Sequence, residues 1–195
     1  MKMKKLFLIN LAFIVAIAVS VQAQEKTDSL TYSYVGTKNC KKCHIKQYKS
    51  WVETKMSMAY DLLKPGERSE AKKKVGLDPE KDYTTDAECL PCHTTGYGKP
   101  GGFVSIEETP QLVGVSCEMC HGAGSEYTKK EHMSLRNKEY KLAELLKVGL
   151  ISPPTAETCT SLCHNDKSPF FKPFDFATRK DEGTHIHLPL KYKHD

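Results

Sequence analysis

Eight cysteines stand in four short segments, each of which ends in Cys-His. Three segments read Cys-x-x-Cys-His, and the fourth, CTSLCH, has three residues between its cysteines. With 8 histidines in 195 residues, a histidine follows a given cysteine by chance only about once in 24 cases. The four sets are Cys40, Cys43 and His44; Cys89, Cys92 and His93; Cys117, Cys120 and His121; and Cys159, Cys163 and His164.

Covalent haem chemistry accounts for this spacing. Two thioether bonds join a pair of cysteines to the two vinyl groups of one porphyrin, and the next residue offers an imidazole nitrogen to the iron. On a helical turn, residues i and i+3 share a face, so Cys-x-x-Cys reaches both vinyl groups while the following histidine turns under the metal. The sequence therefore predicts c-type haem at the first three segments.

The fourth segment has one residue more than the others. Cys159 and Cys163 are four apart, which on a helix is still one face, and a local widening of the turn can return His164 to the iron. A disulfide or a free pair of thiols is the alternative, but neither needs the histidine that follows. We therefore predict a fourth haem here.

Two other uses of cysteine compete with haem for the whole set. Four disulfides are ordinary in a small exported domain, and paired Cys-x-x-Cys elements can bind zinc. Neither use calls for a histidine after every second cysteine. The histidines therefore favour haem.

The first residues resemble an export signal. A lysine-rich start precedes an uncharged run over 6–19, and Val21-Gln22-Ala23 forms a small-x-small cleavage site. The run is about 14 residues long, whereas a membrane-spanning helix needs about 20. We expect a signal peptide over 1–23 and one tetrahaem cytochrome c domain over 24–195, periplasmic and without a membrane span after cleavage.

Charge says little about partners once haems are counted. The formal net charge of +5 includes Lys2, Lys4 and Lys5, so the mature chain carries +2. Four haems add roughly eight propionate groups. Lysine-dense segments such as AKKKVG can pair with propionates or remain solvated, and solvation is expected for most of these lysines. No pattern indicates nucleic-acid binding.

Apolar periodicity predicts two helices. After the first motif, apolar residues recur at intervals of three and four over 45–63 and stop at Pro65-Gly66. KEYKLAELLKVG (138–149) gives a second helix, which Gly149 ends.

The remaining segments favour loops. TTGYGKPGGF (94–103) is a glycine-rich loop, and FVSI (103–106) is expected to pair with LVGV (112–115) in a short β-hairpin. From Ser168 onward, prolines predict an irregular tail without a long helix. The expected fold class is mainly α, with little regular structure outside helices.

Size indicates where the core lies. The mature chain has 172 residues, or about 43 for each of four haems, too few to build a separate apolar pocket around each. The haems are expected to pack against one another and to form most of the core.

Several segments resemble the cytochrome c-554 family of tetrahaem carriers. They are NCKKCHIKQYKSWVETKMSMAYDLLKP, LDPEKDYTTDAECLPCHTTGYGKPGGF and GVSCEMCHGAGSEY. The resemblance covers non-haem positions such as LDPEKDYT and is looser at the fourth motif. It implies a mainly helical tetrahaem fold, periplasmic electron transfer, mostly bis-histidine haems and a five-coordinate second haem. It does not carry over the partner proteins.

The same resemblance suggests distal ligands. His132 matches the family position that ligates the first haem. THIHLPLKY resembles the segment that caps the fourth haem, so His185 is expected there, with His187 as the runner-up. The second haem is left without a distal partner, and its iron is expected to take a small ligand such as nitric oxide. The alternative is that a remaining histidine or methionine fills this position.

The sequence departs from the family at Met56, where the family has a histidine that ligates the third haem. A thioether can also bind haem iron, so Met56 is expected to replace it, and its place in the helix stripe favours it over Met58. The alternative is that Met56 only fills a gap, which is common for methionine.

Three functions fit these features. The first is an electron carrier between redox partner proteins, and we expect this one. The others are an enzyme acting on small nitrogen compounds at the second haem and a subunit of a haem polymer.

Overall fold

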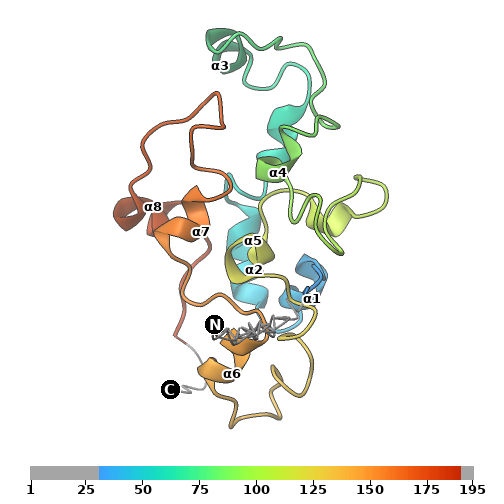
Figure 1. Cartoon of the computed structure of the whole chain (residues 1–195), viewed down its shortest axis with the longest axis vertical. Coiled ribbons are helices and arrows are strands. Elements are labelled where there is room, and N and C mark those ends of the chain that lie inside the picture. Colours follow the sequence, from blue (N-terminus) through green and yellow to red (C-terminus); the bar gives the residue numbers. More distant parts are fainter. Residues whose placement is uncertain (1–30, 190–195) are drawn as a thin grey trace, which may run out of the picture. The chain divides into compact units, whose positions relative to one another are not determined.

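The computed structural model describes residues 31–189 (Figure 1). The chain divides into two units, residues 1–30 and 31–195, and all described residues belong to the second. The expected signal peptide over 1–23 and His194 lie outside the described residues. Among residues 31–189, no helix is both long and apolar enough to span a membrane.

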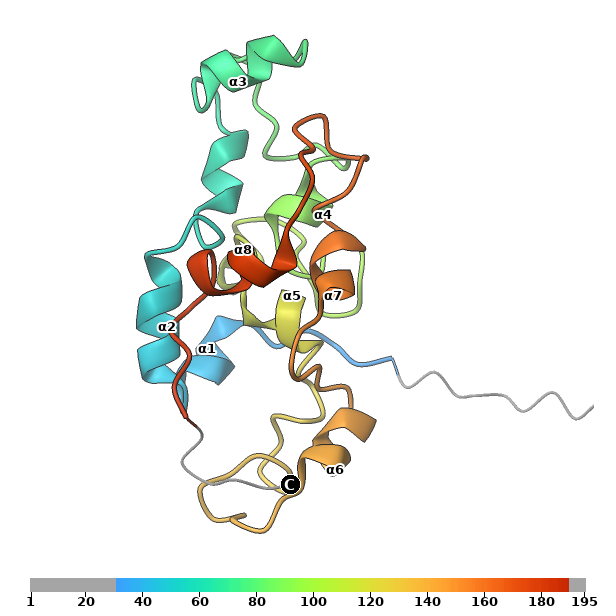
Figure 2. The same cartoon turned by 90° about the vertical axis from the view of Figure 1, so that its left-hand side faces the viewer.

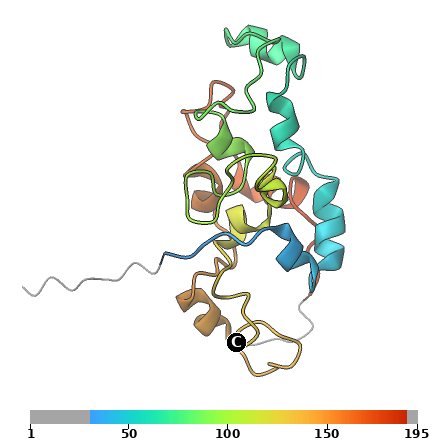
Figure 3. The same cartoon turned by 90° about the vertical axis from the view of Figure 1, so that its right-hand side faces the viewer.

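Short helices joined by long loops make up the described part of the chain (Figures 2 and 3). Between residues 31 and 189 there is no strand, only an isolated antiparallel bridge between Thr94 and Val113. The prediction of a mainly α chain is confirmed. The helices, with 3-10 helices written η, are α1 (Thr37–Lys41), α2 (Ile45–Val52), η1 (Ala59–Leu63), α3 (Ser69–Lys74), α4 (Leu90–His93), η2 (Pro110–Leu112), α5 (Cys117–His121), α6 (Leu142–Lys147), α7 (Ala156–Thr160) and α8 (Phe176–Glu182).

The single helix expected over 45–63 is wrong, because the chain breaks it into α2 and η1. Two hydroxyl groups explain the break. Thr54 Oγ1 donates to Trp51 O at 2.7 Å, and Ser57 Oγ donates to Val52 O at 2.7 Å. These side chains bind carbonyls that would otherwise accept the next helical N–H groups. The apolar periodicity therefore continues across a turn.

The expected hairpin of 103–106 with 112–115 is also wrong. Thr95, from the glycine-rich loop, takes the place between the two segments: its N–H donates to Leu112 O at 2.8 Å, and its carbonyl accepts from Phe103 N at 2.9 Å. The loop itself is confirmed. A Cβ on Gly102 would lie 1.7 Å from Gly96 O, so only glycine permits this approach.

The other two local predictions are confirmed. The helix expected near 138–149 is α6, and Gly149 follows it at a φ of 96°. In the described part of the tail, α8 is the only helix and is short. Its N-cap is Asp175, whose carboxylate accepts from Ala177 N at 3.0 Å.

One lysine of AKKKVG contradicts the expectation of solvation. Lys72 is only 4% exposed, and its ammonium donates to Lys64 O at 2.8 Å and lies 5.2 Å from the centre of the Tyr83 ring. Lys72 therefore holds α3 to the segment before it.

Candidate haem-binding sites

Each of the four cysteine motifs lies at a helical turn. The third motif is the whole of α5, and the second overlaps α4. In the first motif, His44 N donates to Cys40 O at 2.9 Å, an ordinary helical bond across four residues. These turns bring each pair of cysteines and the following histidine onto one side, as the haem interpretation requires.

The fourth motif shows the widened turn that the sequence predicts. His164 N donates to Cys159 O at 3.1 Å, a bond across five residues, as in a π-helical turn. Helix α7 contains Cys159, and Thr155 caps the N-terminus of this helix in a capping box with Thr158. The extra residue is therefore absorbed in the turn, and His164 still follows directly on the second cysteine.

Cysteine thiols of different motifs lie next to each other. None of the eight cysteines forms a disulfide. The thiol of Cys40 lies beside that of Cys117, and the thiol of Cys163 lies beside that of Cys92. These contacts and burial raise the pKa of Cys40 and of Cys163 above the ordinary value. The first and third motifs therefore adjoin, as do the second and fourth.

The motif histidines suit an iron ligand. His93 Nδ1 donates to Ala59 O at 2.5 Å, and His121 Nδ1 donates to Ile151 O at 3.2 Å. A carbonyl only accepts, so these bonds fix the proton on Nδ1 and leave Nε2 free for a metal. Burial lowers the pKa of all four rings and favours the neutral form that binds iron: His44, His93, His121 and His164.

Apolar side chains near the motifs suit a porphyrin. Ile45 follows directly on His44 and is 50% exposed, and Leu162, inside the fourth motif, is 48% exposed. Ile151, whose carbonyl holds His121, is 41% exposed. Exposed apolar groups of this size are typical of surfaces that bind an apolar partner. The residues present therefore fit covalently bound haem c.

Glu118, between the cysteines of the third motif, joins that motif to the first. Its side chain is 1% exposed. Oε2 accepts from Gly36 N at 2.7 Å, and Oε1 accepts from Gly124 N at 2.7 Å, while Val35 N donates to both oxygens at 3.0 and 3.2 Å. Burial and then the Glu118 charge raise the pKa of Tyr34. Sequence reasoning missed this residue, because its partners lie up to 83 positions away.

His132, expected at the first haem, is part-buried. Its Nε2 lies 3.4 Å from Glu126 Oε1. Glu126 also pairs with Lys129 at 2.6 Å. Ligation by His132 remains a prediction.

The two histidines expected near the fourth haem differ in their surroundings. The ring of His185 faces that of His121, with centroids 6.1 Å apart and planes 26° apart, and its Nδ1 donates to Ile186 O at 2.7 Å. His187 instead has Asp181 at 3.3 Å from Nδ1 and Thr184 Oγ1 at 3.3 Å from Nε2. The ring that stacks on His164 belongs to Phe174, with centroids 4.1 Å apart.

Met56 lies in the turn between α2 and η1, so the argument from its place on a helix stripe fails. Its carbonyl accepts from Val115 N at 2.9 Å, which brings its backbone to the start of the third motif. Its methyl group lies 3.9 Å from the point where a Cβ on Gly183 would be. Met56 is thus near the third motif, and its ligation remains a prediction.

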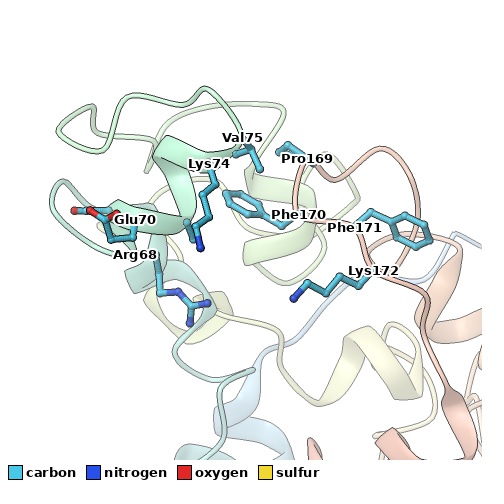
Figure 4. Close-up of a pocket in the computed structure, with 10 residues that line it drawn as sticks. Arg68, Glu70, Lys74, Val75, Pro169, Phe170, Phe171 and Lys172 are labelled. Carbon is cyan, nitrogen blue, oxygen red and sulfur yellow. The ribbon is translucent and has the colours of Figure 1, made fainter.

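A separate cleft of about 860 Å³ lies between α3 and the segment 169–172. Figure 4 shows Arg68, Lys74 and Lys172 around Phe170 in this cleft. None of the motif cysteines or histidines lines it. The cleft is therefore not part of the haem-binding sites.

Comparison with known proteins agrees with this geometry. Residues 39–122 match the family model described as cytochrome c554 and c-prime. Cytochrome c-554 of Nitrosomonas europaea is 45% identical over 94 residues, which are 48% of this chain but only 40% of that protein. The solved structure of the reduced state of cytochrome c554 from Nitrosomonas europaea is 31% identical in sequence and superposes with a TM-score of 0.72. The superposition covers 83% of this chain and 88% of the Nitrosomonas europaea chain.

Short helices, cysteine pairs outside disulfides and histidines with Nε2 left for a metal define a multihaem c-type cytochrome, a class of electron-transfer proteins with covalently bound haem. The matches to the family model and to the solved structure place the chain within that class. It belongs to the cytochrome c554 and c-prime family.

Proposed function

We propose that this chain is a periplasmic electron carrier with four covalent haems, which passes electrons between a donor protein and an acceptor protein. The observation that carries the proposal is the contact between thiols of different motifs, Cys40 with Cys117 and Cys92 with Cys163. Haems attached at adjoining cysteines exchange electrons readily because they lie close to each other. Bound haem supplies one-electron chemistry at its iron.

The polypeptide supports this role through its own contacts. Glu118 holds the first motif against the third through backbone N–H groups. Cys92 Sγ donates to Leu162 O at 3.3 Å, which joins the second motif to the fourth. Carbonyls fix the tautomers of His93 and His121. These contacts hold the first motif against the third and the second against the fourth, and they leave Nε2 of His93 and of His121 available to a metal.

The haem count is tested by intact mass measurement. We expect the mass of the chain without residues 1–23 plus four haems, and N-terminal sequencing of exported protein should begin at Gln24. A mass with three haems would exclude attachment at Cys159 and Cys163.

The carrier role is tested with purified holoprotein in stopped-flow and steady-state experiments. A carrier exchanges electrons rapidly with a small redox dye and shows no turnover. Steady consumption of hydroxylamine, nitrite or nitric oxide would favour an enzyme instead. Rapid sedimentation of large particles would favour a haem polymer.

The second haem, held by Cys89, Cys92 and His93, is proposed to keep an open face. We expect a minority high-spin signal in the oxidised protein that shifts when nitric oxide is added. Spectra that show only six-coordinate haem and ignore the gas would refute this part of the proposal.

A further inference from the structure

We infer that Glu118 bears a buried negative charge that lowers the reduction potentials of the haems attached at the first and third motifs. Glu118 then tunes electron transfer in addition to joining the two motifs. This inference rests on the proposed function, because it needs covalent haem at both motifs.

The carboxyl group of Glu118 is surrounded by hydrogen-bond donors. Its side chain is 1% exposed. The backbone N–H groups of Val35, Gly36 and Gly124 donate to its two oxygens at 2.7–3.2 Å. An N–H group can only donate, so both oxygens act as acceptors, as they do in an ionised carboxylate. These partners carry no net charge, so they stabilise the negative charge of Glu118 without cancelling it.

The buried charge lies at the junction of the two motifs. Glu118 directly follows Cys117, whose thiol lies beside that of Cys40. Gly36 connects Glu118 to the first motif: its N–H donates to Glu118 Oε2 at 2.7 Å, and its carbonyl oxygen is 3.9 Å from Cys40 Sγ. Glu118 is therefore next to an attachment residue in its own motif and is separated by one bridging residue from an attachment atom in the first.

The charge of Glu118 acts on the groups around it. Burial, and after it the Glu118 charge, raise the pKa of Tyr34 and of Tyr127 above the ordinary value. Tyr127 Oη donates at 2.8 Å to the carbonyl of Gly122, the residue after His121. Glu118 thus opposes the formation of a second negative charge beside the third motif. Reduction of a ferric haem also adds one negative charge, so the same field opposes reduction and lowers the potential.

Burial makes this charge differ from a surface charge. Salt and water screen exposed charges, whereas buried charges are screened much less. The side chain of Glu70 is 83% exposed and pairs with Lys73 at 3.2 Å. Neutralising Glu70 or Glu118 changes the net charge of the protein equally, so a comparison of the two isolates the effect of position.

The test compares Glu118→Gln with Glu118→Asp in redox titrations of the purified holoprotein. Glutamine has nearly the shape of glutamate but no charge, whereas aspartate keeps the charge and is one methylene group shorter. In Glu118→Gln we expect the potentials of two haems to rise. In Glu118→Asp the rise should be less than half as large, although this variant also loses hydrogen bonds. Glu70→Gln should leave all four potentials unchanged.

Intact mass and electron paramagnetic resonance spectra separate the charge effect from damage to a haem site. The haem count and the spin states should be those of the wild type in all three variants. A rise that comes with haem loss or a change of spin state would overturn the inference, because ligand loss would then explain it. Unchanged potentials in Glu118→Gln would overturn it too, and so would a rise in Glu118→Asp at least half as large.

The aspartate variant carries the test alone if Glu118→Gln yields no holoprotein. Wild-type potentials in Glu118→Asp would then support the inference, because the charge is retained while hydrogen bonds are lost. A rise in any haem potential of that variant would overturn it.

A Cys159→Ser/Cys163→Ser background identifies the haems concerned. Glu118→Gln should still raise two potentials there, because the first and third haems remain. Loss of the rise would assign the effect to the fourth haem and overturn the inference. If this background yields no holoprotein, the comparison in the full chain decides. Failure of the proposed function is distinct, because it would appear as a wild-type mass with fewer than four haems.

Discussion

Replacement of Glu118 by glutamine should destabilise the protein, although the side chains have nearly the same shape. Each carboxylate oxygen has one short bond of 2.7 Å, to Gly36 N or to Gly124 N. Glutamine keeps one oxygen and puts an NH₂ group in place of the other, so a donor then faces a buried donor. One buried N–H without an acceptor costs about 1–3 kcal/mol, and the lost charge adds to this. We expect a loss of about 2–4 kcal/mol.

Guanidinium unfolding of the holoprotein, followed by haem absorbance and by far-UV circular dichroism, measures this loss. With a slope of about 4 kcal/mol/M, the midpoint should fall by about 0.5–1 M. Glu70→Gln is the matched control, because Glu70 pairs with Lys73 at the surface, where such pairs contribute little. A shift in Glu118→Gln no larger than that of the control would refute the reasoning.

Three further predictions concern other parts of the chain. Gly102→Ala should lower the stability of the protein by more than about 3 kcal/mol in thermal unfolding, because the new Cβ would meet Gly96 O. Gly66→Ala is the control: there is open space around Gly66, and only its φ of 78° opposes the substitution, so the loss should be about 1 kcal/mol. Lys72→Met should lower stability by about 1–3 kcal/mol, because Lys64 O loses its donor; an unchanged melting temperature would contradict this. His132→Ala should turn one low-spin haem high-spin without loss of covalent haem, and unchanged spectra would count against ligation by His132.

What could be predicted from the sequence is mostly local. The Cys-His spacing indicates helical turns, and the inserted residue at the fourth motif appears as the bond from His164 N to Cys159 O. Gly149 ends α6 as expected, since its positive φ suits glycine. These features depend on residues within one or two turns of each other.

What could not be predicted depends on competition or on distance. The apolar pattern over 45–63 is real, but the hydroxyls of Thr54 and Ser57 bind backbone carbonyls and break the helix. The contacts of Glu118 join residues up to 83 positions apart, and nothing in the motif CEMCH reveals them. The hairpin prediction failed because Thr95, from another segment, supplied the hydrogen bonds.

The third motif is the point where these distant contacts meet. Glu118 binds the backbone before the first motif, and Thr95, just after the second motif, donates through Oγ1 to Gly114 O and accepts from Ser116 N. His121 binds Ile151 O on the segment that leads to the fourth motif. A substitution near α5 therefore changes the setting of several motifs at once.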